Sequence, residues 1–134
     1  MRISESQYRQ FIGNYAKQNK YHNKKVEYDG IKFDSQKEKN RYIGLKQLEK
    51  LGVIQNLQRQ VPYLLIDTIK YKGKTYPKTK YYADFQYTDV KSGRTIVEDV
   101  KSEITRKDKI YRLKIKMLLS KYPDIDFEEI ICYN

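Results

Sequence analysis

The chain has 134 residues, a length typical of one domain with a single hydrophobic core. Charged residues make up 34% and hydrophobic residues 39%, and 14 tyrosines supply enough aromatic surface for a folded core, which argues against disorder. The formal net charge is +11, from 28 Lys and Arg against 17 Asp and Glu. Such a charge favours a polyanionic partner such as a phosphate backbone, although it also suits a basic protein that is merely soluble.

Several function classes lack the residues they need. There is no run of about 18 apolar residues and no secretory signal pattern, so we expect no membrane span and a cytoplasmic location. Cys132 is the only cysteine and His22 the only histidine, which excludes a disulfide framework, a zinc site and a Ser/His/Asp or Cys/His triad. A metal site would therefore use oxygen ligands, which favour Mg²⁺, Ca²⁺ or Mn²⁺.

The N-terminal part predicts a helix, a connector and a β-hairpin. Apolar residues recur at helical spacing between Ser4 and about Lys17, with Ser4 as N-cap. A polar, basic connector follows over residues 18–25. Asp29-Gly30 then separates two short alternating segments, the strongest local signal for a β-hairpin.

A second helix and a strand come next. Ser35 stands three residues before Glu38, a capping box that opens a helix over residues 35–51, and Gly52 ends it. Residues 54–67 carry no helical pattern and predict a strand with an irregular start, which Pro62 places at a sheet edge or a bulge.

The C-terminal half predicts a basic hairpin, two strands, a helix and a last strand. Lysines, Gly73 and Pro77 mark residues 70–80 as a basic loop or hairpin tip. Strands over about 80–89 and 94–101 are joined by a turn at residues 91–93. A helix from residue 105 or 107 to 121 follows, ended by Pro123, and residues 127–133 suit a strand. The expected apolar stripe of that helix is Ile110, Leu113 and Met117 with Tyr111 and Leu118.

The strands over 80–89 and 94–101 carry the residues best suited to chemistry. Side chains alternate along a strand, so Asp99 and Lys101 share one face. A two-residue turn at Ser92-Gly93 would place Asp84 opposite Lys101 and Gln86 opposite Asp99, whereas another odd register would place Asp84 opposite Asp99. In either register Asp84, Asp99 and Lys101 converge at the open end of the hairpin.

Two carboxylates at that separation repel each other unless a cation lies between them. We therefore expect Mg²⁺ bound by Asp84, Asp99 and the backbone carbonyl of Val100, with Mn²⁺ able to substitute, and metal-assisted phosphodiester hydrolysis. Lys101 would orient the attacking water or neutralise charge. The structural alternative is an ordinary cross-strand ion pair. A bulge at Glu98 would exchange the two faces, but only Asp99 has a lysine two residues later.

Tyr82-Ala83-Asp84-Phe85 followed by Asp99-Val100-Lys101 resembles the motif of the PD-(D/E)XK nuclease superfamily. The predicted order α-β-β-β-α-β follows the core of that superfamily, and the segment from Tyr21 to about Tyr122 also resembles small phage-encoded endonucleases. Ala83 replaces the proline of the motif at a position that contributes no ligand.

The resemblance implies a fold, further site residues and an activity. The fold would be an α/β (α+β) restriction-endonuclease-like core, a central mixed sheet flanked by helices over residues 26–134, preceded by a helical extension over 1–20 in a single nuclease domain over 1–134. Glu38 matches an acidic residue that completes the metal site in many members, although its capping role is a sufficient structural one. Gln60 resembles a polar residue beside the site. The location would be the cytoplasm of a bacterial host cell.

Six basic residues are candidates for DNA contacts: Lys72, Lys74, Lys107, Lys109, Arg112 and Lys116. Three of them, at 109, 112 and 116, form one helical stripe that could follow a phosphate backbone or simply be solvated. We expect a Mg²⁺-dependent DNA endonuclease selective for branched DNA such as a Holliday junction, acting in phage recombination or replication as a homodimer. The alternatives are a sequence-specific restriction or homing endonuclease and a non-catalytic nucleic-acid-binding module.

Overall fold

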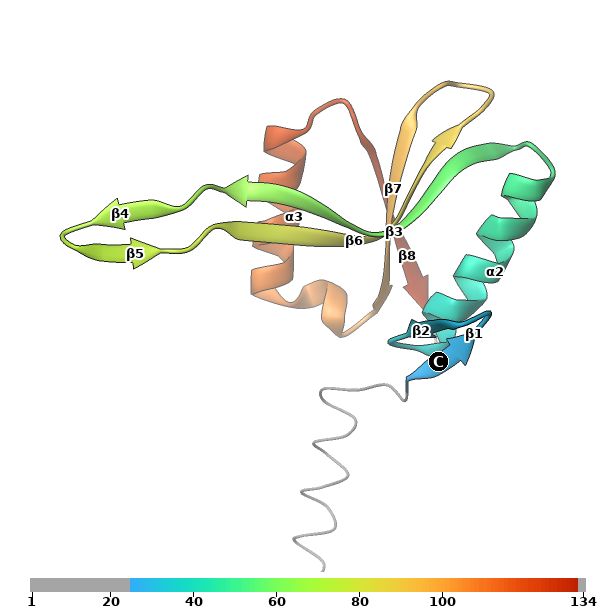
Figure 1. Ribbon diagram of the computed structural model, residues 1–134, viewed down its shortest axis with the longest axis horizontal. Helices are drawn as coiled ribbons and strands as arrows, with labels where there is room; N and C mark the ends of the chain where they lie inside the picture. The colour runs from blue at the N-terminus through green and yellow to red at the C-terminus, as the bar shows by residue number, and fades with distance from the viewer. Residues whose placement is uncertain (1–24, 133–134) are drawn as a thin grey trace, which may run out of the picture. The chain divides into compact units, whose positions relative to one another are not determined.

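The computed structural model describes residues 25–132, whose contacts divide them after Arg41 into two units. The helix predicted between Ser4 and Lys17 lies outside the described residues, as does the connector up to residue 24. The predicted single domain over 1–134, with its extension over 1–20, stays a prediction. The two units are described separately below, and Figure 1 gives the labels of their elements.

The first unit contains the predicted hairpin. Strand β1 (Val26–Tyr28) pairs antiparallel with β2 (Ile31–Phe33). Asp29 and Gly30 have φ angles of 52° and 73°, the left-handed conformations that a tight hairpin turn requires at both central positions. The Asp-Gly signal thus identified both the element and its turn.

Helix α2 (Gln36–Lys50) begins in the first unit and continues into the second. Its start is as predicted, because the Ser35 hydroxyl accepts a hydrogen bond of 3.1 Å from the backbone N–H of Glu38. It ends at Gly52, whose φ of 78° lets the N–H groups of Gly52 and Val53 reach the carbonyls of Glu49 and Leu48.

A four-stranded mixed sheet forms the centre of the second unit. It contains β3 (Ile54–Ile66), β6 (Thr79–Asp89), β7 (Thr95–Ser102) and β8 (Asp126–Cys132), in the order β3-β6-β7-β8. The first three strands are antiparallel and β8 runs parallel to β7. Pro62 lies in β3, an edge strand, where proline is tolerated. The α-β-β-β-α-β order predicted for this part of the chain is confirmed.

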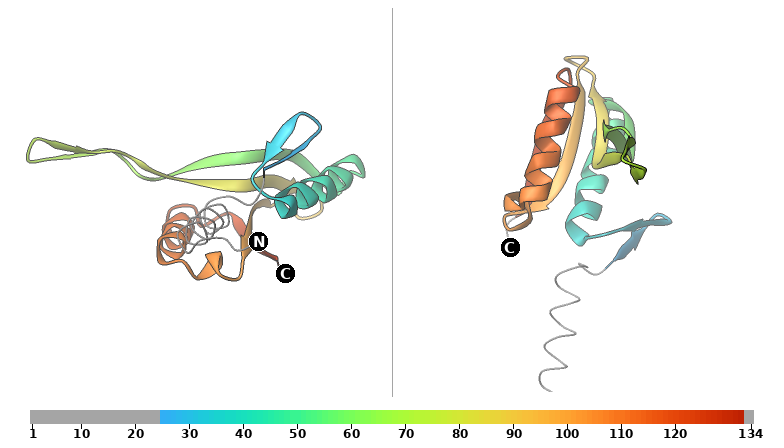
Figure 2. Two further views of the ribbon diagram at one scale, coloured as in Figure 1. Left: turned by 90° about the horizontal axis from the view of Figure 1, so that it is seen from below. Right: turned by 90° about the vertical axis from the view of Figure 1, so that its left-hand side faces the viewer.

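The basic segment forms a hairpin between β3 and β6. Strands β4 (Ile69–Tyr71) and β5 (Lys74–Tyr76) pair antiparallel around Lys72 and Gly73, whose φ angles are 50° and 74°. The hairpin, here called the arm (residues 67–78), projects from the sheet in Figures 1 and 2. It is a two-stranded ribbon at the end of the long strands β3 and β6.

The late helix differs from the prediction at its start and in its buried face. A short 3₁₀ turn (Thr105–Lys107) precedes α3 (Lys109–Lys121), because the Asp108 carboxylate caps the helix by accepting from the N–H of Tyr111 at 3.0 Å.

Neither α2 nor α3, the α-helices within residues 25–132, is long and apolar enough to cross a membrane.

Helix α3 packs on the sheet through Tyr111 and Leu118, which join Leu65, Tyr81, Ala83 and Val97 in one buried cluster. The expectation that Ile110 and Leu113 face the core is wrong, since they are 68% and 55% exposed. Apolar residues occur on several sides of this helix, so periodicity alone does not determine which of them pack on the sheet. In the structure, Tyr111 and Leu118 do.

Candidate active site

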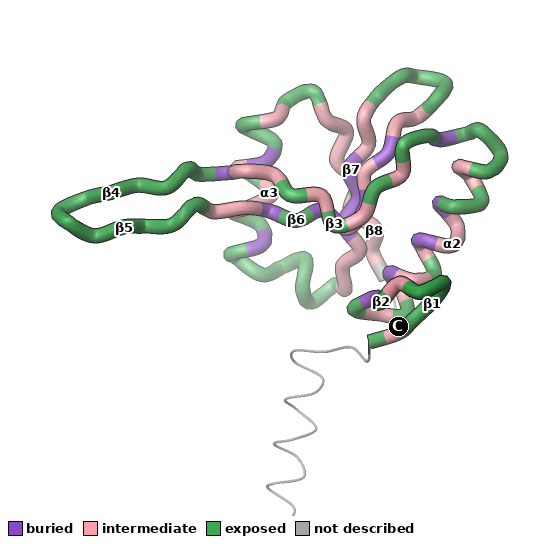
Figure 3. Tube along the Cα trace, in the orientation of Figure 1, coloured by how far each residue is buried: buried purple, intermediate pink, exposed green. Residues whose placement is uncertain are grey.

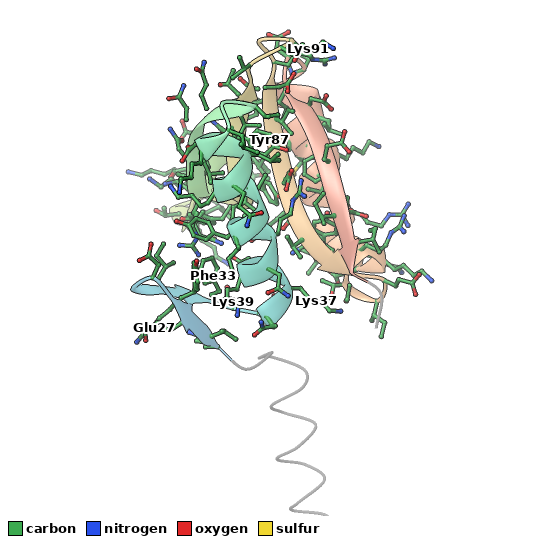
Figure 4. All side chains as sticks on the ribbon, turned by 90° about the vertical axis from the view of Figure 1, so that its right-hand side faces the viewer. Glu27, Phe33, Lys37, Lys39, Tyr87 and Lys91 are labelled. Atoms are coloured by element: carbon green, nitrogen blue, oxygen red, sulfur yellow. The ribbon has the colours of Figure 1, made fainter. Side chains whose placement is uncertain are left out.

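The turn between β6 and β7 sets the register of the site. Thr88 pairs with Thr95 and Phe85 with Glu98, so the two-residue turn that would place Asp84 opposite Lys101 is wrong. The Asp89 carboxylate accepts hydrogen bonds from the N–H and the hydroxyl of Ser92, at 3.0 and 2.6 Å, which stabilises a longer turn with Lys91 near its tip (Figure 4). The observed register is the other odd one, in which Asp84 would lie opposite Asp99.

The sheet is interrupted at Asp84. The pairing of β3 with β6 passes over Gln60 and Asp84, and the pairing of β6 with β7 begins only at Phe85 and Glu98. Gln60 has a φ of 48°, a left-handed conformation that is unusual for a residue inside a strand. The backbone N–H of Val100 donates instead to the Asp84 carboxylate, at 2.8 Å. A strand residue directs its N–H and C=O to the same edge, so the Val100 carbonyl points to this interruption too.

Hydrogen bonds orient both carboxylates. Besides the Val100 N–H, Asp84 accepts a bond of 3.2 Å from Gln60 Nε2, so the structure brings Gln60 next to Asp84. Asp99 Oδ2 accepts a bond of 2.7 Å from the Tyr81 hydroxyl and lies 3.5 Å from Lys101 Nζ. Asp84, Asp99 and Lys101 therefore do converge, as the alternation along the strands predicted.

Asp99 is only 1% exposed, and its environment disfavours its charge. Burial, followed by the hydrogen bond and the charge of Asp84, raises the pKa of Asp99 to about 8, while Lys101 and Tyr81 act in the opposite direction. Without a cation, the two carboxylates are close enough to share a proton. A divalent cation could replace that proton, as expected of paired carboxylates that bind metal.

Lys101 is held from two sides. Its Nζ lies 4.9 Å from the centre of the Tyr111 ring as well as near Asp99, and its side chain is 24% exposed. The Tyr111 hydroxyl donates to Glu129 at 2.6 Å, and Glu129 also pairs with Arg106 at 3.2 Å. Burial and the bond to Glu129 raise the pKa of Tyr111, so the hydroxyl stays protonated as a donor. Glu129 thus holds the Tyr111 ring in place beside Lys101 Nζ.

Sequence reasoning missed Tyr81, Tyr111 and Glu129. Tyr81 lies an odd number of residues from Asp84, so simple alternation places it on the other face of β6, and only the interruption at Asp84 lets it reach Asp99. Tyr111 and Glu129 come from α3 and β8, and nothing in their local sequence signals that the Tyr111 ring meets Lys101 or that Glu129 accepts from Tyr111. Asp89 and Ser92 did carry a signal, an Asp-x-x-Ser-Gly turn, that favours the longer loop.

Glu98 occupies the other face of β7. It is 1% exposed and accepts a hydrogen bond from the hydroxyl of Tyr87. Glu98 pairs across the strands with Phe85, whose ring stacks on Tyr42 of α2. The bulge that would have exchanged Glu98 and Asp99 is therefore absent at the Phe85–Glu98 pair, and Asp99 is the acid that meets Asp84.

The donor set fits a hard divalent cation. Within residues 25–132, no group of three or more His, Cys, Asp or Glu side chains is arranged to hold a metal. Asp84 and Asp99, with the Val100 carbonyl at the same interruption, nevertheless offer oxygen atoms only, and Mg²⁺ is commonly held by one or two carboxylates with water completing its shell. Glu38 is 4% exposed and lies in the first unit, so its predicted part as a ligand stays a prediction.

Comparison with known proteins places the chain in a family. A family described as "Protein of unknown function (DUF1064)" matches residues 18–133. The chain belongs to the DUF1064 family. It is also similar to a solved structure titled "Crystal structure of SSO0001", at 23% identity and a TM-score of 0.36. That match covers 69% of this DUF1064 chain but only 44% of the solved chain. No curated protein matches.

The predicted DNA contacts of this DUF1064 chain fall in two places. Lys72 and Lys74 lie on the arm, and the other four lie around the start of α3 and along it. All six are exposed: Lys72, Lys74, Lys107, Lys109, Arg112 and Lys116. A pocket lined by three basic residues and by Glu103 and Glu129 includes Tyr111, whose ring lies near Lys101. Contact of these residues with DNA stays a prediction.

Proposed function

We propose that this DUF1064 protein is a Mg²⁺-dependent DNA endonuclease of the PD-(D/E)XK type. The observation that carries the proposal is the meeting of Asp84, Asp99 and Lys101 at an interruption of the sheet. The α-β-β-β-α-β order around a mixed sheet supports it, because the same order characterises the superfamily that the motif resembles. The location in a bacterial cytoplasm belongs to the same proposal.

The residues of the chain are arranged for this chemistry before any substrate binds. The Val100 N–H and Gln60 fix Asp84, and Tyr81 fixes Asp99, so little reorganisation is needed. Asp84 and Asp99 would hold Mg²⁺, or Mn²⁺ in its place, which would supply charge stabilisation at the phosphate and an activated water. Lys101, held against Asp99 and Tyr111, provides an N–H donor to the negative charge that develops on the phosphate oxygens.

Branched DNA is the proposed substrate. The net charge of +11 and the exposed cations of the arm and α3 favour a phosphate backbone, and such contacts give affinity without reading sequence. A four-way junction has two symmetric cutting positions, which a homodimer would match.

A cleavage assay tests the proposal. The purified chain is incubated with an end-labelled four-way junction and with a linear duplex of the same arm sequence, each in Mg²⁺, in Mn²⁺ and in EDTA. We expect cuts in the junction that need the metal and fade as salt rises. Cleavage of neither substrate would contradict the proposal and favour a non-catalytic binding module. Discrete fragments from genomic DNA, without preference for branches, would favour a sequence-specific endonuclease.

A metal-binding measurement tests the site independently of cleavage. Mn²⁺ titrated into the wild type and into Asp84→Asn, followed by electron paramagnetic resonance, should show binding in the first and a large loss in the second. Equal binding by both chains would mean that Asp84 is not a ligand.

A further inference from the structure

The arm presents one apolar, aromatic face. Ile69 pairs with Tyr76 and Tyr71 with Lys74, so these four side chains lie on the same side of the ribbon. Ile69, Tyr71 and Tyr76 are 51%, 60% and 46% exposed. Every residue from 66 to 78 is exposed, as Figure 3 shows along the length of the arm. The arm therefore displays two tyrosine rings that are largely open to solvent.

The arm is also strongly basic. Residues 68–80 contain five lysines and no acidic residue. Lys72 Nζ lies 5.4 Å from the centre of the Tyr71 ring, and Lys74 Nζ lies 5.1 Å from that of Tyr76. Each exposed ring thus has its own cation beside it. An aromatic face interleaved with lysines suits nucleic acid, because bases stack on the rings while the lysines meet phosphates.

We propose that the arm binds unstacked bases of DNA, at a branch point or a single-stranded gap, through Tyr71 and Tyr76. The proposal deepens the endonuclease function and rests on it for the choice of DNA as partner. Stacking requires a base whose face is open, and the faces of bases inside a duplex are covered by their neighbours. The tyrosines would therefore distinguish branched or gapped DNA from an intact duplex, a selection that the lysines alone would not make.

A second copy of the chain is a poorer occupant for this face. Two arms paired through their aromatic faces would bring Lys74 and its neighbours from both copies together, and like charges in close cross-strand contact are destabilising. A polyanion removes that repulsion. The charge of the arm thus favours nucleic acid over self-association.

The position of the arm limits where it would contact DNA. Tyr76 precedes the proposed metal ligand Asp84 by eight residues in the chain, so the two lie at most about 26 Å apart at the rise of an extended strand. That span corresponds to about eight base steps of a DNA strand. The bases held by the arm should therefore lie within about eight nucleotides of the cut.

The test measures binding without cleavage. The full-length chain is titrated in EDTA into a four-way junction carrying 2-aminopurine at the branch point, and into a linear duplex carrying it at an internal position. Fluorescence anisotropy of an end label gives the affinity, and the 2-aminopurine signal reports stacking. The variant is Y71A/Y76A, and the matched control is Tyr28→Ala, an exposed tyrosine of the other β-hairpin.

The wild type should change the 2-aminopurine signal at the branch and bind the junction at least about tenfold more tightly than Y71A/Y76A does. Duplex affinity of the variant should stay within about threefold of wild type, since its lysines remain. Tyr28→Ala should behave as wild type on both substrates.

Three results would overturn the inference: equal losses on junction and duplex, no loss on either, or a wild-type dimer that the tyrosine substitutions dissociate. Cleavage is scored separately in Mg²⁺. If the wild type cuts DNA and Y71A/Y76A binds junctions normally, the proposed function stands and the proposed role of the arm is refuted. If the chain stacks on bases at the branch but never cuts DNA, the proposed catalysis is refuted and the role of the arm stands.

Discussion

Glu98 and Asp99 follow each other on β7, and comparing their surroundings shows what distinguishes an acid of the candidate site from another buried acid. Both are 1% exposed, and each accepts a hydrogen bond from a tyrosine hydroxyl, that of Tyr87 or that of Tyr81. Asp99 also faces a second carboxylate, that of Asp84, and a lysine. A tyrosine donor is thus common to both acids and indicates no function by itself, whereas two acids beside a lysine are arranged for a cation.

The largest effect is expected from Asp99→Asn. Loss of one carboxylate should lower metal-dependent cleavage by about a thousandfold or more, because metal stabilisation of the transition state amounts to several kcal/mol. The pKa of Asp99 is raised, so its charge is unfavourable in the metal-free fold, and the neutral amide should not lower the melting temperature without metal. Full cleavage by this variant would remove Asp99 from the site.

Lys101→Met should come next. Removal of a preorganised donor to developing charge typically lowers the rate by about 10²- to 10³-fold, and we expect the same for junction cleavage in single-turnover assays. Mn²⁺ affinity should change little, because the ammonium is not a ligand. Lys91→Met, in the exposed turn at the far end of the hairpin, is the charge-matched control and should cleave normally. If the cleavage rate of Lys101→Met equals that of the wild type, the contact between Asp99 and Lys101 is only a structural ion pair.

The two tyrosines give a matched pair of smaller changes. Tyr81→Phe removes the donor that orients Asp99 and should weaken Mn²⁺ binding by about 10- to 100-fold, as loss of partners to metal ligands usually does. Tyr87→Phe removes the equivalent donor from Glu98 and should leave Mn²⁺ binding as it is. Equal effects of the two substitutions, measured by titration, would erase the distinction between the two acids.

Glu98→Gln should have the smallest effect on activity. The side chain keeps its volume but its hydrogen bonding at a buried position changes, so we expect the free energy of unfolding in urea to fall by about 1–3 kcal/mol. Cleavage under conditions where the variant is folded should stay within about threefold of wild type. A loss of cleavage comparable with that of Asp99→Asn would mean that both faces of β7 serve the reaction.

Local chemistry made much of the fold predictable. Asp29-Gly30 specified a hairpin turn, Ser35 and Gly52 set the ends of α2, and the lysine-rich segment with Gly73 indicated the arm. The convergence of Asp84, Asp99 and Lys101 followed from strand periodicity in any odd register. These features depend on a few neighbouring residues, which is why sequence alone carries them.

Features that depend on distant parts of the chain were not predictable in the same way. The register needed the Asp89–Ser92 contact, the face of α3 that packs on the sheet depends on Tyr111 meeting β8, and Tyr81 reaches Asp99 only because the sheet is interrupted at Asp84. Each of these is decided by how elements pack together, and local propensity does not encode it.

The bond from the Val100 N–H to Asp84 has a consequence for tolerance to mutation. At this position the backbone serves the site, because the N–H of Val100 donates to Asp84 and its carbonyl lies at the same edge of the strand. The half-exposed valine side chain takes no part in that hydrogen bond. Substitution of Val100 by other apolar or β-branched residues should therefore be almost neutral. Proline, which has no N–H to donate, is the exception, and it would release Asp84 while leaving every acidic and basic side chain of the site in the sequence.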